Sequence, residues 1–294
     1  MLRPAVLLTL LSGCHLVFGV DPEGGPAVCG PYAAPEEVAF SELVENPHEL
    51  SIDAAGQLAM VNADYQGTTG PLALRLEGGV WVFDETRNMG LETRGGARLQ
   101  ASGVGLFAWD QAGTLITEYT LVEVAMGFVW NPVVQTIDFD TFDIKIAGNA
   151  IELERNGAIQ RLLVLTRIST EGDRKLEIRR KTADNEAWGI TSALETFPAH
   201  SPAITPSLGL LTEDAERFVY AATVGDDPVS HLYASARNVD NTSYSPGERL
   251  QIVGVGDDVE VTEPWINGDC SELYFTMEGR IMYARQLDAP DRGQ

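Results

Sequence analysis

Residues that could do chemistry are sparse in this chain, apart from its carboxylates. It contains four His, and His48, His200 and His231 are too far apart to form a His-x-x-x-His or His-Glu-x-x-His zinc motif. The sequence contains neither a Gly-x-Ser-x-Gly nucleophile elbow nor a Gly-rich phosphate loop ending in Lys and Ser or Thr. We therefore predict no catalytic residue, no metal ion and no cofactor.

One acidic run alternates carboxylates with aromatic residues between positions 138 and 143. On a strand, Asp138 and Asp140 share one face while Phe139 points to the other. We interpret the run as a half-buried strand with one solvent-exposed face. Asp138 and Asp140 are kept as candidate cation ligands, although the spacing does not fit an EF-hand loop.

The overall charge restricts the class of partner. The 294 residues include 43 Asp and Glu but only 20 Lys and Arg, which gives a formal net charge of −23. Nucleic acids and anionic membrane surfaces are bound by basic residues, so no nucleic-acid partner is expected. The excess acid predicts a solvated surface that keeps the protein soluble, with an acidic site for cations or a basic partner as the alternative.

The start of the chain has the features of an export signal. Arg3 precedes a short apolar run, Pro4–Leu11, which is too short to span a membrane but suits a secretory signal. The run ends in Leu-Ser-Gly-Cys, which resembles the bacterial lipobox. That resemblance implies that acyl chains on Cys14 anchor the mature protein to a membrane. The alternative is an ordinary signal peptide in which Cys14 is incidental.

If Cys14 is lipidated, the protein is exported and anchored at the outer membrane or cell surface, with the inner membrane as the alternative. Cys29 and Cys270 then remain as an even pair in an oxidising compartment, where disulfides form. Two unpaired thiols are the other possibility at this stage.

Short apolar runs separated by Gly-containing turns dominate the rest of the sequence. The clearest pair is a β-hairpin, with Glu272–Thr276 and Arg280–Arg285 flanking Met277-Glu278-Gly279. Similar hairpins recur at intervals of 48, 56, 56 and 55 residues, and each unit has about four strand candidates. Their first strands start near Gln57, Gly105, Arg161, Arg217 and Glu272. Four strands per repeat of this length predict an all-β propeller, with a β-sandwich or β-solenoid as alternatives.

The last third of the chain resembles the repeat of TolB-like propellers. In that repeat a Pro-Ser-Leu strand, an acidic turn, a Leu-Tyr-Phe strand and a Tyr-Ala-Arg strand succeed one another. The matching segments are 204–208, 213–214, 218–221, 232–237, 263–265, 273–275 and 282–285. TolB-like propellers commonly have six blades, whereas the repeats here favour five, with six as the alternative. The resemblance implies protein partners at the propeller face or in its channel.

A propeller must close its ring, because an open blade edge exposes unpaired backbone groups. We predict that a strand at Glu37–Leu43 supplies the outer strand of the last blade, which otherwise has only three. Cys29 lies shortly before that strand and Cys270 lies in the last blade. A Cys29–Cys270 disulfide would link the segment before the closing strand covalently to the last blade.

These predictions divide the chain into a signal peptide (1–13), a lipidated N-terminus and tether (14–35), a propeller domain (36–287) and a polar tail (288–294). The five Trp residues, about one per repeat, are expected to pack between blades rather than to stack on sugars. They are Trp81, Trp109, Trp130, Trp188 and Trp265.

The function predicted first is a cell-envelope lipoprotein whose propeller is a non-catalytic binding surface for an envelope protein or a small ligand. The sequence does not indicate which residues bind it. The alternative is a carbohydrate-active hydrolase with carboxylates in the channel, one acting as acid and one as base or nucleophile. A third possibility is a purely structural envelope protein.

Overall fold

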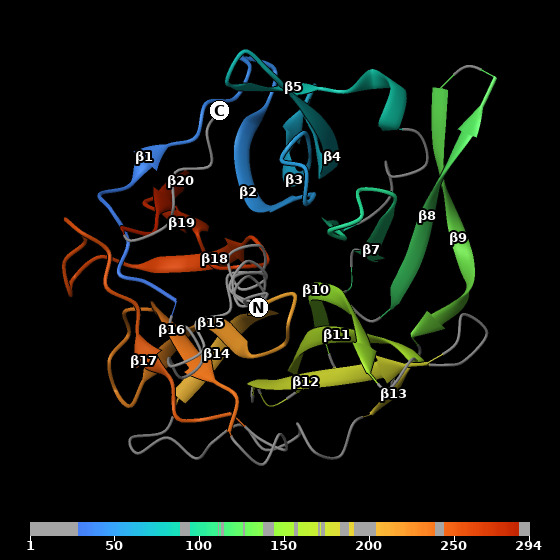
Figure 1. Ribbon diagram of the computed structural model, residues 1–294. Helices are drawn as coiled ribbons and strands as arrows, with labels where there is room; N and C mark the ends of the chain where they lie inside the picture. Colours follow the sequence, from blue (N-terminus) through green and yellow to red (C-terminus); the bar gives the residue numbers. More distant parts are fainter. Residues whose placement is uncertain are drawn as a thin grey trace, which may run out of the picture.

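The structure, a computed structural model, describes residues 29–88, 95–110, 112, 115–125, 127–137, 144–155, 158–169, 171, 174–182, 188–190, 204–238 and 244–287. Its strands form five four-stranded antiparallel sheets. The sheets stand around a common axis as the blades of a ring (Figure 1). In this part of the chain the only helix is the short 3₁₀ helix η1 (Glu85–Arg87). The protein is a five-bladed β-propeller, which confirms the predicted fold class and the preferred blade count.

Blades 1 to 4 each use four consecutive strands. Blade 1 consists of β2 (Glu45–Ile52), β3 (Leu58–Tyr65), β4 (Thr68–Glu77) and β5 (Val80–Phe83). Blade 2 consists of β6 (Gly96–Leu99), β7 (Gly105–Trp109), β8 (Ile116–Val124) and β9 (Gly127–Ile137). Blade 3 consists of β10 (Ile144–Arg155), β11 (Ala158–Ile168), β12 (Arg174–Lys181) and β13 (Gly189–Ile190). Blade 4 consists of β14 (Ile204–Leu211), β15 (Arg217–Val224), β16 (His231–Ala236) and β17 (Glu248–Arg249).

Blade 5 joins the two ends of the propeller. Its strand order is β1 (Glu36–Glu37), β20 (Arg280–Arg285), β19 (Glu272–Met277) and β18 (Val261–Ile266). The first strand of every blade lies innermost, and β2, β6, β10, β14 and β18 contact one another around the axis. Their ends therefore decide what faces the central channel.

The recurring hairpin in the sequence corresponds to the second strand of each blade. The five predicted starts lie in or next to β3, β7, β11, β15 and β19. All five residues of β7 and the first six of β15 are buried. Because a neighbouring blade covers each face of these strands, their sequences are apolar without alternation, and this made the repeat visible.

The hairpin of β19 and β20 has the expected tight turn. Glu278 and Gly279 both have positive φ angles, 52° and 74°. Two such residues in succession match the type I′ turn that suits the right-handed twist of a two-strand hairpin. The two strands pair from Glu272 with Arg285 to Met277 with Arg280.

The ring closes as predicted, by an N-terminal strand in the last blade. Glu36 pairs with Tyr283 and Glu37 with Met282. The strand is shorter than the predicted Glu37–Leu43, because the chain then crosses to blade 1. There the Trp81 N–H donates to the Ala39 carbonyl, and the Ser41 N–H donates to the Trp81 carbonyl, both at 2.9 Å. The same segment thus holds the outer edges of the last and first blades together.

A disulfide joins Cys29 to Cys270 with a Cα–Cα distance of 5.4 Å, as predicted. The two cysteines are 241 residues apart in sequence. In the chain-entropy model a loop of that length corresponds to about 5 kcal/mol of stabilisation. Both cysteines are buried in the core cluster that spans blades 4, 5 and 1.

The five Trp side chains are all buried, as predicted. Trp81 and Trp265 belong to the core around the closure, and Trp109 and Trp188 pack together between blades 2 and 3. Packing between blades therefore accounts for them, and none is an exposed platform for a sugar.

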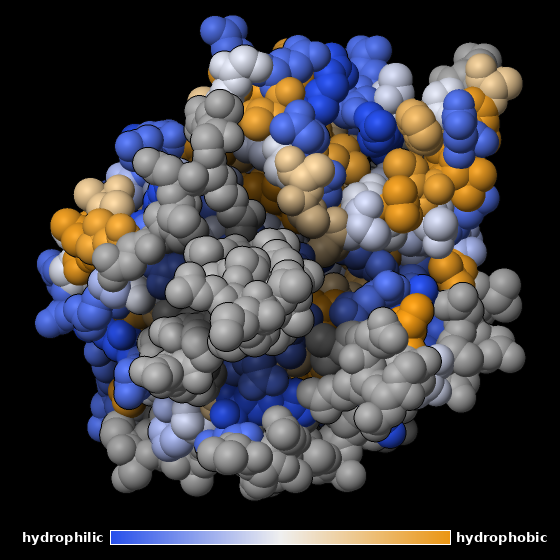
Figure 2. All heavy atoms as spheres, viewed as in Figure 1, coloured by the Kyte–Doolittle hydropathy of each residue, from blue (hydrophilic) through white to orange (hydrophobic). Residues whose placement is uncertain are grey.

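The hairpin of β8 and β9 extends past its blade. β7 pairs with only the first five residues of β8, whereas β8 and β9 remain paired to their tip. This arm stands out from the ring (Figure 1) and packs on blade 1, where the Trp130 indole donates to the Arg87 carbonyl at 2.7 Å. Val122 and Val124 on the arm are exposed. Figure 2 shows hydrophobic residues gathered at this end of the molecule.

Candidate functional site

A cavity of about 390 Å³ opens where the innermost strands end, and we call it the mouth cavity. Every blade contributes to its wall. The lining residues are Ile52 to Gly56 (blade 1), Ala101 (blade 2), Asn149 to Ile151 (blade 3), Leu211 and Glu213 (blade 4), and Trp265 to Asp269, Glu272 and Tyr274 (blade 5). The cavity therefore lies on the propeller axis, at one end of the channel.

The blade 1 part of the wall is a tight turn between β2 and β3. The Asp53 carboxylate accepts the backbone N–H groups of Gln57 at 2.8 Å and Leu58 at 3.0 Å. Gly56 takes a φ of 66°, which glycine adopts without strain. Asp53 is thus held at the rim by the turn that it stabilises.

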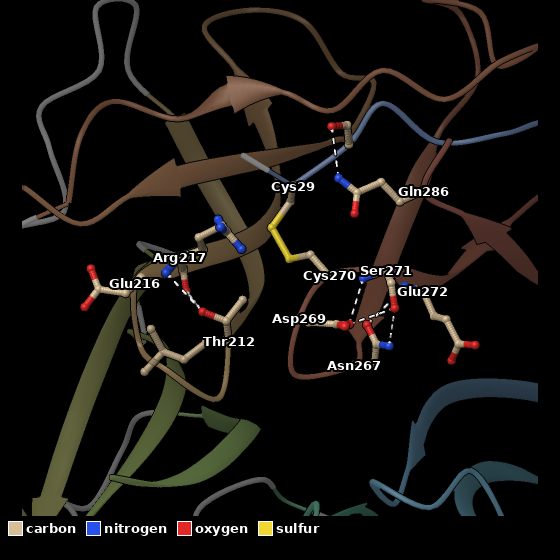
Figure 3. The surroundings of a disulfide bond; sticks show 12 residues. Cys29, Thr212, Glu216, Arg217, Asn267, Asp269, Cys270, Ser271, Glu272 and Gln286 are labelled. Carbon is tan, nitrogen blue, oxygen red and sulfur yellow. Dashed lines mark hydrogen bonds between the residues drawn. A yellow bond between two sulfur atoms is a disulfide. The ribbon is translucent and has the colours of Figure 1, made fainter. Parts of the chain in front are cut away.

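The blade 5 part is the loop 267–272, which runs from the end of β18 to the first residue of β19. The Asn267 side chain bonds to Ser271 Oγ at 2.8 Å and accepts the Glu272 N–H at 3.0 Å. Ser271 in turn donates to the Asp269 carboxylate from its N–H at 3.1 Å and from its hydroxyl at 2.7 Å. These bonds, drawn in Figure 3, make the loop a compact unit that presents Asp269 and Glu272 to the cavity.

On the opposite wall, Asn149 of β10 joins blade 3 to blade 4. Its Nδ2 donates to the Leu211 carbonyl at 2.6 Å, and its Oδ1 accepts the Leu211 N–H at 2.8 Å. The amide satisfies both backbone groups of Leu211 at the end of β14. The wall of the cavity and the seam between these blades therefore share one side chain.

The ionisable part of the lining is acidic. Asp53, Glu213, Asp269 and Glu272 contribute four carboxyl groups, and no Lys or Arg occurs among the described lining residues. Burial raises the pKa of the Tyr274 hydroxyl, and the nearby Glu272 carboxylate raises it further. Tyr274 therefore stays neutral, and the cavity attracts positive charge.

A second charged group lies where blades 5, 1 and 2 meet, and we call it the channel cluster: Arg98, Glu49, Glu263 and Asn62. The Arg98 side chain is 1 % exposed, and its Nη1 donates to the Leu50 carbonyl at 3.3 Å and the Pro264 carbonyl at 3.5 Å. Because Leu50 and Pro264 lie on β2 and β18, this guanidinium from blade 2 reaches across blade 1 to blade 5.

The carboxylates of the channel cluster have bonding partners of their own. Glu49 accepts from the Asn62 side chain, and Glu263 accepts from Thr276 Oγ1 at 2.8 Å. Burial raises the pKa of Glu49, while Arg98 opposes that rise and Glu263 adds to it. Burial likewise lowers the pKa of Arg98, and both glutamates oppose this. These bonds favour a structural role for the cluster in holding blades 5, 1 and 2 together.

The sequence did not predict the mouth cavity or the channel cluster. A signal for the cluster was nevertheless present, because Glu-Leu-Ser-Ile-Asp (49–53) and Glu-Pro-Trp-Ile-Asn (263–267) occupy the same place in blades 1 and 5. In each, a glutamate with positive φ precedes the last residue of an innermost strand by three positions.

Among the predicted site residues, only Cys29 and Cys270 lie in the part of the chain that the structure describes, and they form the disulfide. Cys14, Asp138 and Asp140 lie outside the described residues, as does His200. No group of three or more potential metal ligands occurs within the described part. His231 is buried beside Asp227 at 4.0 Å, and His48 lies in β2. The described residues include no helix long and apolar enough to cross a membrane.

No protein-family model matches the chain, and no curated protein matches it. Solved structures with a similar fold include TolB from Acinetobacter baumannii, at 10% identity and a TM-score of 0.43, covering 82% of this chain and 54% of that one. MPT-4, a mannose phosphorylase from Leishmania mexicana, is 6% identical with a TM-score of 0.48 and covers 88% of both chains.

A third similar structure is an α-L-arabinanase from Penicillium chrysogenum, at 11% identity and a TM-score of 0.44, covering 84% of this chain and 80% of that one. These similarities concern the fold. Any assignment of function has to rest on the residues of this chain.

Proposed function

We propose that the protein is an exported bacterial lipoprotein whose propeller is a non-catalytic binding surface, and that the mouth cavity takes a cationic group of a protein partner. The observation that carries this is the acidic lining of the mouth cavity, to which all five blades contribute. A Lys or Arg side chain, or an amino terminus, has the complementary charge. The TolB-like pattern of the sequence supports a protein as the partner.

The chemistry of the lining favours binding over catalysis. Asp53 and Asp269 are already engaged, since each accepts hydrogen bonds that shape its own turn. A glycosidase needs two carboxyl groups on either side of the scissile bond. Glu213 and Glu272, from adjacent blades, do not shape a turn through their carboxylates, although the Tyr283 hydroxyl hydrogen-bonds to Glu272, so this pair carries the alternative of a carbohydrate-active hydrolase.

Membrane anchoring is the second part of the proposal. The lipobox-like Leu-Ser-Gly-Cys (11–14) supports acylation of Cys14. In a detergent phase-partition experiment we expect the wild type in the detergent phase and Cys14→Ser in the aqueous phase. Equal partition of the two proteins would contradict lipidation.

The binding site is tested by capture from solubilised cell envelopes, comparing the wild type with Glu213→Gln/Glu272→Gln. We expect the double variant to lose the captured partner, and added salt to weaken capture by the wild type. Glu123→Gln/Glu248→Gln is the matched control, because both residues are exposed and lie outside the cavity. Equal capture by the cavity variant and the control would exclude this site.

The hydrolase alternative is tested with chromogenic aryl glycosides. The non-catalytic proposal expects no turnover by the wild type. Turnover that Glu213→Gln or Glu272→Gln abolishes, and Glu123→Gln does not, would replace binding by hydrolysis as the function of the same cavity.

A further inference from the structure

The disulfide and the mouth cavity share one loop. Cys270 lies within the loop 267–272, which contributes Asn267, Gly268, Asp269 and Glu272 to the cavity wall. Figure 3 shows the disulfide beside Asn267, Asp269 and Ser271. What holds Cys270 therefore also places the wall of the cavity.

Cys270 has a left-handed backbone conformation, with a φ of 63°, which is uncommon for residues other than glycine. Ala215 has a φ of 56° at the matching turn of blade 4, so the turn itself favours this conformation. Within the loop, the Cys270 N–H donates to the Asn267 carbonyl at 3.1 Å. From outside the loop, the disulfide to Cys29 and a 3.0 Å hydrogen bond from the Tyr32 hydroxyl to the Cys270 carbonyl hold this residue. The Glu213 N–H also donates to the Gly268 carbonyl at 3.2 Å, and the Gln286 N–H to the Ser271 carbonyl at 2.9 Å.

Residues 29–33, which we call the strap, are positioned independently of the sulfur atoms. The Tyr32 N–H donates to Gln251 O at 2.8 Å in blade 4, and the Ala33 N–H donates to Arg285 O at 2.8 Å in blade 5. The Leu287 N–H donates a hydrogen bond to the Pro31 carbonyl at 2.9 Å. Tyr32 is fully buried. The strap is therefore a fixed point to which the disulfide ties the loop.

We propose that oxidation of Cys29 and Cys270 sets the mouth cavity in its binding form, so that the ligand site becomes competent only after export. In the reduced chain the strap and the pairing of β1 with β20 keep the ring closed. The loop 267–272 then loses its covalent tie and is held by hydrogen bonds alone, so Asp269 and Glu272 are less firmly fixed toward the cavity. The ligand part of this inference rests on the function proposed above.

The chemistry needs a disulfide oxidant of the exporting compartment. One cysteine thiolate attacks the oxidant and forms a mixed disulfide, and the thiolate of the second cysteine then displaces the oxidant's sulfur. The two thiols lose two electrons and two protons in total, and the oxidant leaves as a dithiol. In a reducing cytosol the same pair stays as thiols.

Hydrogen exchange measured by mass spectrometry tests the structural part without a ligand. We compare the full chain carrying Cys14→Ser with the same chain carrying Cys29→Ala and Cys270→Ala. We expect exchange in 267–272 to become at least tenfold faster, while the strap and β20 keep their protection. Unchanged exchange in the loop, or equal loss over all of blade 5, would overturn the proposal.

A milder variant covers the case in which the double variant does not fold. Tyr32→Phe keeps the disulfide and removes the hydroxyl bond to Cys270, so we expect a smaller increase in exchange confined to 267–272. An increase spread over β19 and β20 would show that the strap stabilises the whole blade, and would overturn the proposal.

Binding of a pentalysine peptide, followed by calorimetry, tests the ligand part. We expect the oxidised chain to bind and the reduced chain to bind at least tenfold more weakly. Equal binding overturns oxidative control of the site. If neither form binds while the loop still responds to oxidation, the cationic ligand is wrong and the control of the loop by the disulfide stands.

Discussion

Glu49 and Glu263 meet across the seam between blades 1 and 5, where the Glu49 N–H donates to the Glu263 carboxylate at 3.1 Å. Both residues have positive φ, 54° and 52°, and both interrupt the pairing of an innermost strand at a β-bulge. A bulge redirects the side chain of its residue. Here it brings two acidic residues of neighbouring blades to the same buried guanidinium, that of Arg98.

The raised pKa of Glu49 predicts how stability depends on pH. The ordinary value is 4.5, and burial raises the pKa in the folded state. Between these two values the folded chain binds more protons than the unfolded chain, so the contribution of Glu49 to stability falls as pH rises through this window. We expect Glu49→Gln to flatten that decline in urea unfolding measured between pH 4 and pH 8. A Glu49→Gln profile parallel to that of the wild type would show that Glu49 is not the group responsible.

Arg98 should matter most when both glutamates are charged. Arg98→Met leaves Glu49 and Glu263 facing each other without a cation, and breaking a buried charge cluster in this way costs about 3 kcal/mol. We expect that loss in the free energy of unfolding at pH 7 and a smaller loss as the pH is lowered, because protonation of Glu49, whose pKa is raised, relieves the repulsion. Arg98→Lys, which keeps the charge, should lose less. An Arg98→Met protein as stable as the wild type at pH 7 would contradict this account.

The second strands and the ring closure could be predicted from sequence, because both depend on local patterns. β15, for example, is buried on both faces, and its sequence is therefore a continuous apolar run. The closing strand followed from a blade with three strands and a spare segment at the other end of the chain. The Cys29–Cys270 pair followed from the same reasoning.

The mouth cavity could not be predicted in this way, because its wall is assembled from short loops that are far apart in sequence. Asp53 and Glu213 each look like an ordinary turn residue, and only the ring brings them to one axis. The channel cluster was hidden for a related reason. The bulges at Glu49 and Glu263 break the alternation that marks a strand, so the innermost strands have weaker patterns than the second strands.

Asn149 tests how much one side chain contributes to a seam between blades. Asn149→Ala removes both hydrogen bonds to Leu211. The buried backbone N–H and C=O of Leu211 then have neither of these partners. Leaving such groups unsatisfied costs about 1–3 kcal/mol each, so we expect a loss of about 3 kcal/mol in unfolding free energy. Asn131→Ala, at an exposed position of β9, is the control and should change stability by less than about 0.5 kcal/mol. Loss of the same size in both variants would mean that the seam does not depend on Asn149.

A substitution at Gly148 tests how closely the innermost strands β10 and β14 pack against each other. A Cβ atom at this position would lie 2.1 Å from the Gly209 carbonyl oxygen of β14 and 3.1 Å from Val164 Cβ. Because the first of these is a backbone atom of the neighbouring blade, the contact can be relieved only by moving β10 away from β14. Overpacking of this kind typically costs about 1–3 kcal/mol, and a backbone clash lies at the upper end.

We therefore expect Gly148→Ala to lower the free energy of unfolding by about 3 kcal/mol in urea titrations. Gly256→Ala is the matched control, since that glycine is exposed and the nearest atom to its Cβ would be the end of the Asp258 side chain, which can rotate away. The control should remain within about 0.5 kcal/mol of the wild type. A Gly148→Ala protein of wild-type stability would show that blades 3 and 4 can separate at the axis without loss, and that the close packing of β10 on β14 does not determine the width of the ring.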